Sequence, residues 1–466
     1  MTLKDYRDLE ISGATGTARD AFERALDSHL SWRSGADLHL QQAVREAPAF
    51  TMAYVLRCYF DLCNRDWARV QLARSAYATA SSLPATPRER LHLAAIEAAL
   101  ADDFETFRTL LHRLLEQYPR DVLALQVGHA FDYLTGDSEG MAARIEAVLP
   151  AWSADTPGYH AVLAMQAFSL VESAQYGSAA DRALRALEIN PWDARAHHAM
   201  THVHEMTGNA AGGMRWMRER HRFWGADTVA ATHCWWHWGL FHLALGEVRP
   251  ALAIYDQYVR GKRSTEISDL IDASALLWRI ELADGNTARR CSELASAWAA
   301  RIEDGYCTFN DVHAMLAQVG AEDWQGARRL ESALLSNHRQ PTRYGETTRL
   351  IGLPACRAIV AFGRGDYPRA LHLFSLLPAY AHRLGGSHAQ RDLLQLTALE
   401  AARRLGRSPR SVAARVALPC RWHRQPRRDG SRSDCFISSA PRKRVAGVCP
   451  PVRCSPIEAR PECIGH

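Results

Sequence analysis

The chain has 466 residues, of which 47% are hydrophobic and 23% are charged, an ordinary composition for a folded globular protein. Its net charge is +5, but residues 411–466 hold eleven basic and four acidic groups, which leaves residues 1–410 with 45 basic and 47 acidic groups. The main part of the chain therefore lacks the basic excess of a nucleic-acid-binding domain.

The first 16 residues are expected to lead into the main domain. They begin MTLKDYRDLEISG, which lacks the apolar region of a signal peptide. No run of about 18 uncharged apolar residues occurs further along the chain. We therefore expect a cytoplasmic protein with no membrane partner and no nucleic-acid partner for its folded body.

A helical repeat organises residues 17–405. From Ser169 to Pro191, SLVESAQYGSAADRALRALEINP, small and bulky residues are spaced as in a tetratricopeptide repeat, where small residues let the two helices of a hairpin approach closely. A turn residue recurs at intervals of 34 to 43 residues, before an apolar helical pattern. We expect these turns near Arg65, Asp102, Gly136, Ala174, Gly208, Gly246, Gly285, Glu322 and Gly365. The pattern predicts an all-α fold, a right-handed superhelix (solenoid) of about nine degenerate tetratricopeptide-like hairpins.

Histidines concentrate in the middle of this repeat. Eight of the 21 lie between His197 and His242, and they include two pairs spaced four residues apart, which share a helix face. Because the first helices of successive hairpins line the concave surface of a solenoid, we expect these pairs side by side in a polar, aromatic-rimmed pocket. Its predicted residues are His198, His202, Glu205, His233, Trp236, His237, Asp272, Asn310, Asp311 and His313.

Three interpretations of this cluster stay open. The imidazoles can be packing groups that bond to carboxylates and indoles, or they can line a recognition pocket with Trp235, Trp236 and Trp238 as apolar walls. The third interpretation is a metal site, since paired histidines with a carboxylate can ligate zinc or iron. Its ligands would be His198, His202, His233 and His237. The stretch HEMTG lacks the second histidine of a zincin motif.

The leading functional hypothesis is a binding or scaffold protein without a cofactor. Its concave groove would take a peptide, a protein or a small molecule. The alternative is an enzyme, of the metal-dependent hydrolase kind, that uses the same His/Glu/Asp cluster, with Glu205 or His202 as general base. No nucleophile elbow, phosphate loop or dinucleotide motif occurs, so no catalytic residue is assigned and enzymatic activity stays an open question.

Five stretches carry a family resemblance. They are HHAMTHVHEMTGN from His197, HCWWHWGLFHLALGEVRPALAIYDQYV from His233, DLIDASALLWRIELADG from Asp269, FNDVHAMLA from Phe309 and GGSHAQRDL from Gly385. With them the chain resembles the tetratricopeptide repeat protein 38 family and its bacterial members, from about residue 17 to residue 399. The resemblance implies the helical-repeat fold and implies no particular reaction.

The segment 406–466 breaks the repeat. After Arg410 it contains seven prolines, ten arginines, five cysteines and one leucine, a composition that cannot bury a core. We expect disorder here. Our preferred hypothesis is a frameshift that replaces the last helices of the solenoid, and the alternative is a genuine basic tail that binds an acidic partner or nucleic acid.

Overall fold

The computed structural model describes residues 3–407, which all lie within one compact unit. A short antiparallel sheet, β1 (Leu3–Lys4) with β2 (Glu10–Ile11), occupies the segment expected to lead into the domain. The rest of the described chain forms helices and their connections, which confirms the all-α fold. None of the described helices combines the length and apolar character needed to cross a membrane. The segment 406–466 is predicted to be disordered or frameshifted. Apart from its first two residues, it lies outside the described residues.

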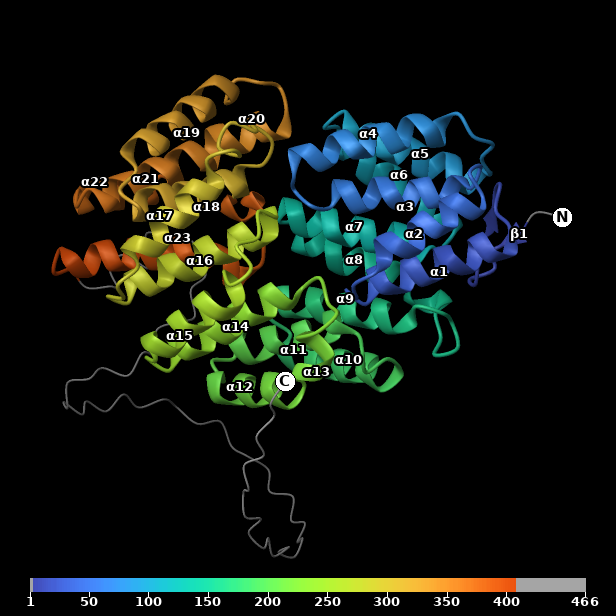
Figure 1. Ribbon diagram of the computed structural model, residues 1–466, viewed down its shortest axis with the longest axis horizontal. Helices are drawn as coiled ribbons and strands as arrows, with labels where there is room; N and C mark the ends of the chain where they lie inside the picture. Colours follow the sequence, from blue (N-terminus) through green and yellow to red (C-terminus); the bar gives the residue numbers. More distant parts are fainter. Residues whose placement is uncertain (1–2, 408–466) are drawn as a thin grey trace, which may run out of the picture. The chain divides into compact units, whose positions relative to one another are not determined.

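Ten helical hairpins follow one another within residues 3–407 (Figure 1), each with a first helix, here called helix A, and a second, helix B. The first five pairs are α1 (Gly16–Leu30) with α2 (Ala36–Glu46), α3 (Thr51–Leu62) with α4 (Trp67–Ser81), α5 (Pro87–Leu100) with α6 (Phe104–Gln117), α7 (Val122–Thr135) with α8 (Ser138–Val148), and α9 (Tyr159–Glu172) with α10 (Tyr176–Ile189). The other five are α11 (Ala194–Met206) with α12 (Ala210–Glu219), α14 (Ala231–Ala244) with α15 (Val248–Ile254), α16 (Ile267–Leu282) with α17 (Ala288–Trp298), α18 (Thr308–Gly320) with α19 (Trp324–Asn337), and α21 (Leu353–Gly363) with α22 (Tyr367–Ser375). The connections contain η1 (Leu149–Ala151), α13 (His221–Trp224), η2 (Tyr255–Val259), α20 (Arg343–Thr347), η3 (Thr348–Gly352) and η4 (Ala381–Leu384), and α23 (His388–Arg404) comes last.

The turns between helix A and helix B lie where the sequence predicts them. Eight of the nine predicted turn residues have φ between +53° and +77°, and the ninth turn has its positive φ at Asp284, one residue before Gly285. This left-handed residue turns the chain so that the backbone N–H of the next residue can cap a free carbonyl group in the last turn of helix A. An example is the backbone N–H of Asn209, which donates to the carbonyl of His204. The structure has one more hairpin than expected, because the turn after α1 has a different spacing.

Some of the A helices are buried on nearly every side. In α11 all residues from Ala194 to Val203 are buried, and in α16 all residues from Leu270 to Ile280 are buried. By contrast, the buried residues of α10 are Ala179, Ala183 and Ala186, a single stripe. Helix B covers only one face of helix A, so other parts of the chain must cover the opposite face.

Contacts between early turns and late segments provide this cover. The side chain of Asn310 donates to the carbonyl of Arg65 at 2.8 Å, which joins α18 to the turn after α3. The backbone N–H of Arg343 donates to Asp102 at 2.8 Å, and its guanidinium donates to the carbonyl of Thr135 at 3.0 Å. The face of the A helices away from their B helices, here called the inner wall, is therefore closed by the chain itself.

The C-terminal helix takes part in the closure. The segment η4 contacts α7, and α23 contacts α11, α16 and α21. Figure 1 shows this red segment running beside α16 and reaching α7. A Cβ atom on Gly136, in the turn after α7, would lie 1.9 Å from the carbonyl oxygen of His382. The two backbones are thus in direct contact at this point.

Histidines also join neighbouring A helices. Asp121, the N-cap of α7, lies 2.9 Å from Nε2 of His92 on α5. Asp193, the N-cap of α11, lies 2.7 Å from Nδ1 of His160 on α9, whose Nε2 lies 3.5 Å from Asp27. These two histidines hold the ends of adjacent hairpins together.

The closure predicts unequal effects of two matched glycine substitutions. Gly136 (φ +71°) and Gly208 (φ +69°) occupy equivalent turns, but a Cβ on Gly208 meets no atom within 4 Å. Both alanine variants carry backbone strain of about 1 kcal/mol. We expect Gly136→Ala to lower the free energy of unfolding by about 2 kcal/mol more than Gly208→Ala, because its backbone contact must open. Equal urea midpoints for the two variants would contradict the closure.

The His160 contacts predict a pH-dependent stability. Burial lowers the pKa of His160, but its bonds to Asp193 and Asp27 outweigh burial and raise the pKa to about 9. Because the folded pKa lies above the unfolded value, the stabilisation is complete below about pH 6.5 and disappears as the pH rises through 9. We expect the stability difference between wild type and His160→Gln to shrink by about 3 kcal/mol across this range. The exposed His112→Gln serves as control, and a difference that is flat with pH would refute the prediction.

Candidate functional site

The stretch with three histidines and three tryptophans forms α14, and its two faces have different neighbours. His233, Trp236 and His237 belong to the inner wall, where the ring of His233 stacks on that of Trp236 with centroids 5.1 Å apart. Trp235 and Trp238 lie on the other face, against Trp224 and Tyr258. The expectation that all three indoles wall one pocket is therefore wrong, because residues one apart on a helix point in different directions.

Four imidazoles meet on the inner wall between α11 and α14. One ring nitrogen from each of His198, His202, His233 and His237 can be chosen so that all four lie within 4.8 Å of one another. The Nε2 atoms of His198 and His202 are 3.0 Å apart. The Nε2 atom of His237 is buried and has no hydrogen-bond partner among residues 3–407. We call these four residues the histidine cluster.

Carboxylates lie directly behind two of these rings. Nδ1 of His237 is 2.7 Å from Glu205 on α11, and Nδ1 of His233 is 2.9 Å from Asp272 on α16. These bonds orient both rings and leave their Nε2 atoms as the free ends. A carboxylate on the far nitrogen is the usual support of a metal-bound histidine, since it fixes the tautomer and makes the ring a stronger ligand.

Burial keeps most of the cluster uncharged. Desolvation, together with neighbouring imidazoles, lowers the pKa of His198, His202 and His237 well below the usual value. Burial also raises the pKa of Glu205 to about 8. For His233, burial lowers the pKa, but Asp272 outweighs it, so that the pKa is raised. Neutral rings present the lone pairs that a metal ion requires.

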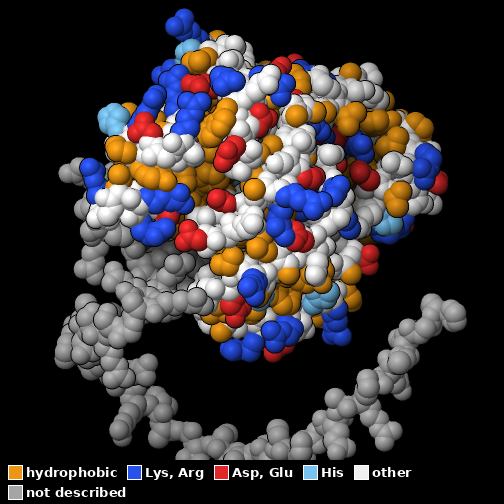
Figure 2. Space-filling view, turned by 60° about the vertical axis from the view of Figure 1, so that its left-hand side comes forward, with side chains coloured by type: hydrophobic (Ala, Val, Ile, Leu, Met, Phe, Trp, Pro, Cys, Tyr) orange, Lys and Arg blue, Asp and Glu red, His pale blue; other side chains and the backbone are white. Residues whose placement is uncertain are grey.

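The cluster is closed off from solvent. His202 and His237 are fully buried and 4% of His198 is exposed, whereas 20% of the His233 side chain is accessible. On the face shown in Figure 2, histidine side chains form only small separate patches. The expected open pocket is therefore not found at these residues, because the closure of the inner wall covers them. His233 is the side on which the cluster approaches solvent.

Two residues beside the cluster were missed from the sequence. Glu172 on α9 lies 2.8 Å from Nδ1 of His388 at the start of α23, and it also forms an ion pair with Arg391. The charge of Glu172 acts on His202, which places this pair next to the cluster. The stretch GGSHAQRDL, which contains His388 and Arg391, is one of the motifs of the family resemblance. The motif could therefore have drawn attention to these residues, whereas the spacing of the repeat gave no reason to place them beside the cluster.

The other predicted site residues fall into two groups, one beside the histidine cluster and one away from it. Trp236 stacks on the ring of His233, and Asp272 lies 2.9 Å from its Nδ1. Asn310 donates to the carbonyl of Arg65, Asp311 accepts from the hydroxyl of Tyr344 at 3.0 Å, and His313 bonds to the carbonyl of Phe309. These three side chains of α18 make their contacts elsewhere on the inner wall. Of the residues predicted to line one pocket, those on α11, α14 and α16 therefore lie together, and those on α18 do not.

Comparisons with known proteins add little to this geometry. The chain matches no known protein-family model. It is similar to a solved structure described as the TPR domain of P58(IPK), with 13% sequence identity and a TM-score of 0.17. That match covers 84% of this chain and 98% of the other. A similarity this low carries no argument about family or function.

Proposed function

We propose that this helical-repeat protein binds a transition-metal ion through His198, His202, His233 and His237. The binding role expected from the sequence is kept, but the ligand is a metal ion in place of a peptide in an open groove. The observation that carries the proposal is the convergence of four ring nitrogens from two helices within 4.8 Å.

The donor set indicates the class of metal. Imidazole nitrogens suit zinc, iron, copper and nickel, whereas magnesium and calcium prefer oxygen ligands. A tetrahedral zinc ion with Zn–N distances of about 2.0–2.1 Å places its ligands about 3.4 Å apart. Binding would draw the most widely separated ring nitrogens together and would move the Nε2 atoms of His198 and His202, now 3.0 Å apart, slightly away from each other. Zinc and iron, the ions named in the metal-site alternative from the sequence, belong to this class.

Two buried polar atoms that lack hydrogen-bond partners support the proposal that a metal ion binds here. The Oε1 atom of Glu205 and the Nε2 atom of His237 are buried without partners among the described residues. Unpaired buried polar groups are costly, and structures normally satisfy them. A cation bound to Nε2 of His237 favours a proton on its Nδ1 and an ionised Glu205, which together make a charge-assisted bond.

The number of protein ligands favours a structural or storage role over catalysis. Four protein ligands fill a tetrahedral ion, whereas catalytic zinc sites keep one position open for water or substrate. The ion would join α11 to α14 and, through Asp272, to α16. In this proposal metal binding stabilises the closed inner wall. A ligand that binds the native state and not the unfolded state shifts the folding equilibrium towards the native state.

The proposal extends to family and location. The motifs around His198, His233 and His388 support membership of the tetratricopeptide repeat protein 38 family, and the sequence composition supports a cytoplasmic protein. Localisation of the tagged protein in cells tests the second part.

Metal content is the first test. The purified full-length protein, after loading with zinc or iron, is expected to hold about one equivalent of metal. His202→Gln and His237→Gln should lose it, because each removes one imidazole from the cluster. His242→Gln, on the solvent side of α14 beside Glu247, should retain it. Circular dichroism confirms that each variant folds, and a loaded wild type without metal, or equal content in all variants, would overturn the proposal.

Glu205 tests the orientation of the ligands. Glu205→Gln keeps the shape of the side chain and a bond to His237 but removes the charge. We expect metal affinity, measured by competition with a chelator, to fall by about 10- to 100-fold. Glu247→Gln is the matched control, since the exposed Glu247 lies at the same 2.7 Å from the partly buried His242. Equal affinities for both variants would show that Glu205 does not support a metal ligand.

A further inference from the structure

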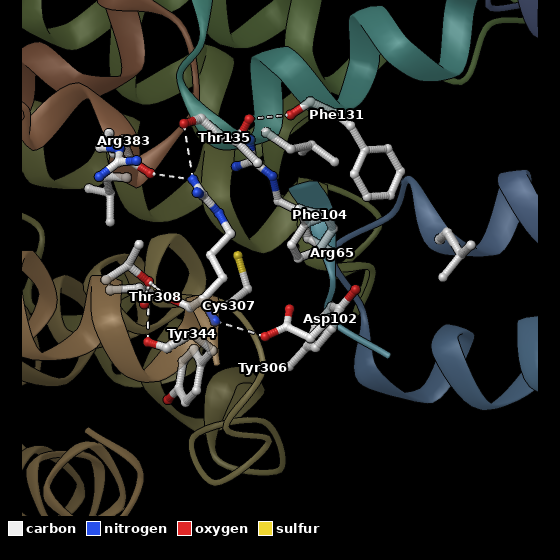
Figure 3. A pocket seen from close by; sticks show the side chains of 15 residues that line it. Arg65, Asp102, Phe104, Phe131, Thr135, Tyr306, Cys307, Thr308, Tyr344 and Arg383 are labelled. Carbon is white, nitrogen blue, oxygen red and sulfur yellow. Dashed lines mark hydrogen bonds between the residues drawn. The ribbon is translucent and has the colours of Figure 1, made fainter. Parts of the chain in front are cut away.

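A second polar site lies away from the histidine cluster, in a cavity of about 80 Å³ between early turns and late segments. One water molecule needs about 10–15 Å³ of such volume, so the cavity has room for several waters or one small polar group. Figure 3 shows Arg65, Asp102 and Thr135 approaching from the first half of the chain, and Tyr306 and Arg383 from the second half.

Three guanidinium groups line this cavity with little negative charge to balance them. Arg343 donates to the carbonyls of Thr135 and Arg383, each at 3.0 Å, and no ion pair of its guanidinium is found among residues 3–407. Within residues 3–407, the ion pair found for Arg383 is a distant one with Glu346, at 3.9 Å. The pKa of Arg343 is lowered by burial and by the charges of Arg108 and Arg383.

Arg65 is the least satisfied of the three. One of its terminal nitrogens, Nη2, is buried and lacks a hydrogen-bond acceptor in the part of the chain that the structure describes. The guanidinium lies 4.3 Å from the ring centroid of Phe309 and 5.2 Å from that of Tyr133. Stacking on two aromatic rings holds the group in place without neutralising its charge.

The one carboxylate on the cavity wall is already engaged. Asp102 accepts the backbone N–H of Arg343 at 2.8 Å, and burial raises its pKa. The neighbouring Arg108 is balanced by Asp132 and Asp137 and does not need a further anion. Apolar side chains form the rest of the wall and strengthen electrostatic interactions by excluding water. They include Leu62, Phe104, Phe131 and Leu134.

We propose that this cavity binds a small oxyanion, a carboxylate or phosphate group, between Arg65, Arg343 and Arg383. The planar fork of arginine matches the paired oxygens of both groups, and charge-assisted bonds of this kind are strong where water is excluded. Bound anion would also bridge the two halves of the chain at the point where the inner wall closes. The site is independent of the histidine cluster, so it stands whether or not that cluster holds metal.

Calorimetric titration of the full-length protein with sodium phosphate, and separately with sodium acetate, tests the site. Sodium chloride at equal ionic strength corrects for screening. We expect saturable binding of at least one anion at a concentration of about 1 mM or below. Phosphate alone would identify a phosphate site and acetate alone a carboxylate site, and both results support the proposal. No saturable binding of either by about 10 mM would overturn it.

Substitutions locate the bound anion. Arg65→Gln and the more exposed Arg383→Gln should each weaken binding by at least about tenfold, because each removes a charged donor. Arg357→Gln removes a surface arginine paired with Glu331 and should leave binding unchanged. Circular dichroism confirms the fold of each variant. Binding that is equally strong in all three would place the anion outside this cavity and contradict the proposal.

Discussion

The structure depends on the contact between the early hairpin turns and the late segments. A tetratricopeptide-like array exposes one face of its A helices unless something covers it. Here Asn310, Arg343 and the segment η4 contact the turns after α3, α5 and α7, and α23 fills the space next to α11 and α16. The closure removes water from the inner wall, where the chain has placed histidines, arginines and carboxylates.

Desolvation then decides the chemistry of the inner wall. Exposed imidazoles in a groove would titrate near neutral pH, but buried ones lose their charge unless a carboxylate pairs with them. His160 shows the paired outcome, and His198 and His202 show the unpaired one. The pKa of His237 is also lowered although Glu205 lies 2.7 Å away, because burial raises the pKa of Glu205 to about 8. Three neutral rings that lie close to one another, with a fourth held by Asp272, form the site at which we propose a bound transition-metal ion.

The sequence predicts local features well and closure poorly. The repeat predicts the turn positions, because a left-handed residue must end each helix A, and i,i+4 spacing places His198 with His202 and His233 with His237. Spacing within one repeat carries no information about contacts between Arg65 and Asn310, which are 245 residues apart. For the same reason the pairing of Glu172 with His388 was missed, and a pocket was expected where the chain is closed.

The central claim is that closure brings four imidazoles to a single point at which they bind one metal ion. X-ray absorption spectroscopy at the edge of the bound metal measures this directly. For the zinc-loaded protein the account predicts about four nitrogen scatterers at about 2.0–2.1 Å, with the outer-shell pattern of imidazole. Sulfur scatterers, a shell made mainly of oxygen, or fewer than three imidazoles would contradict it.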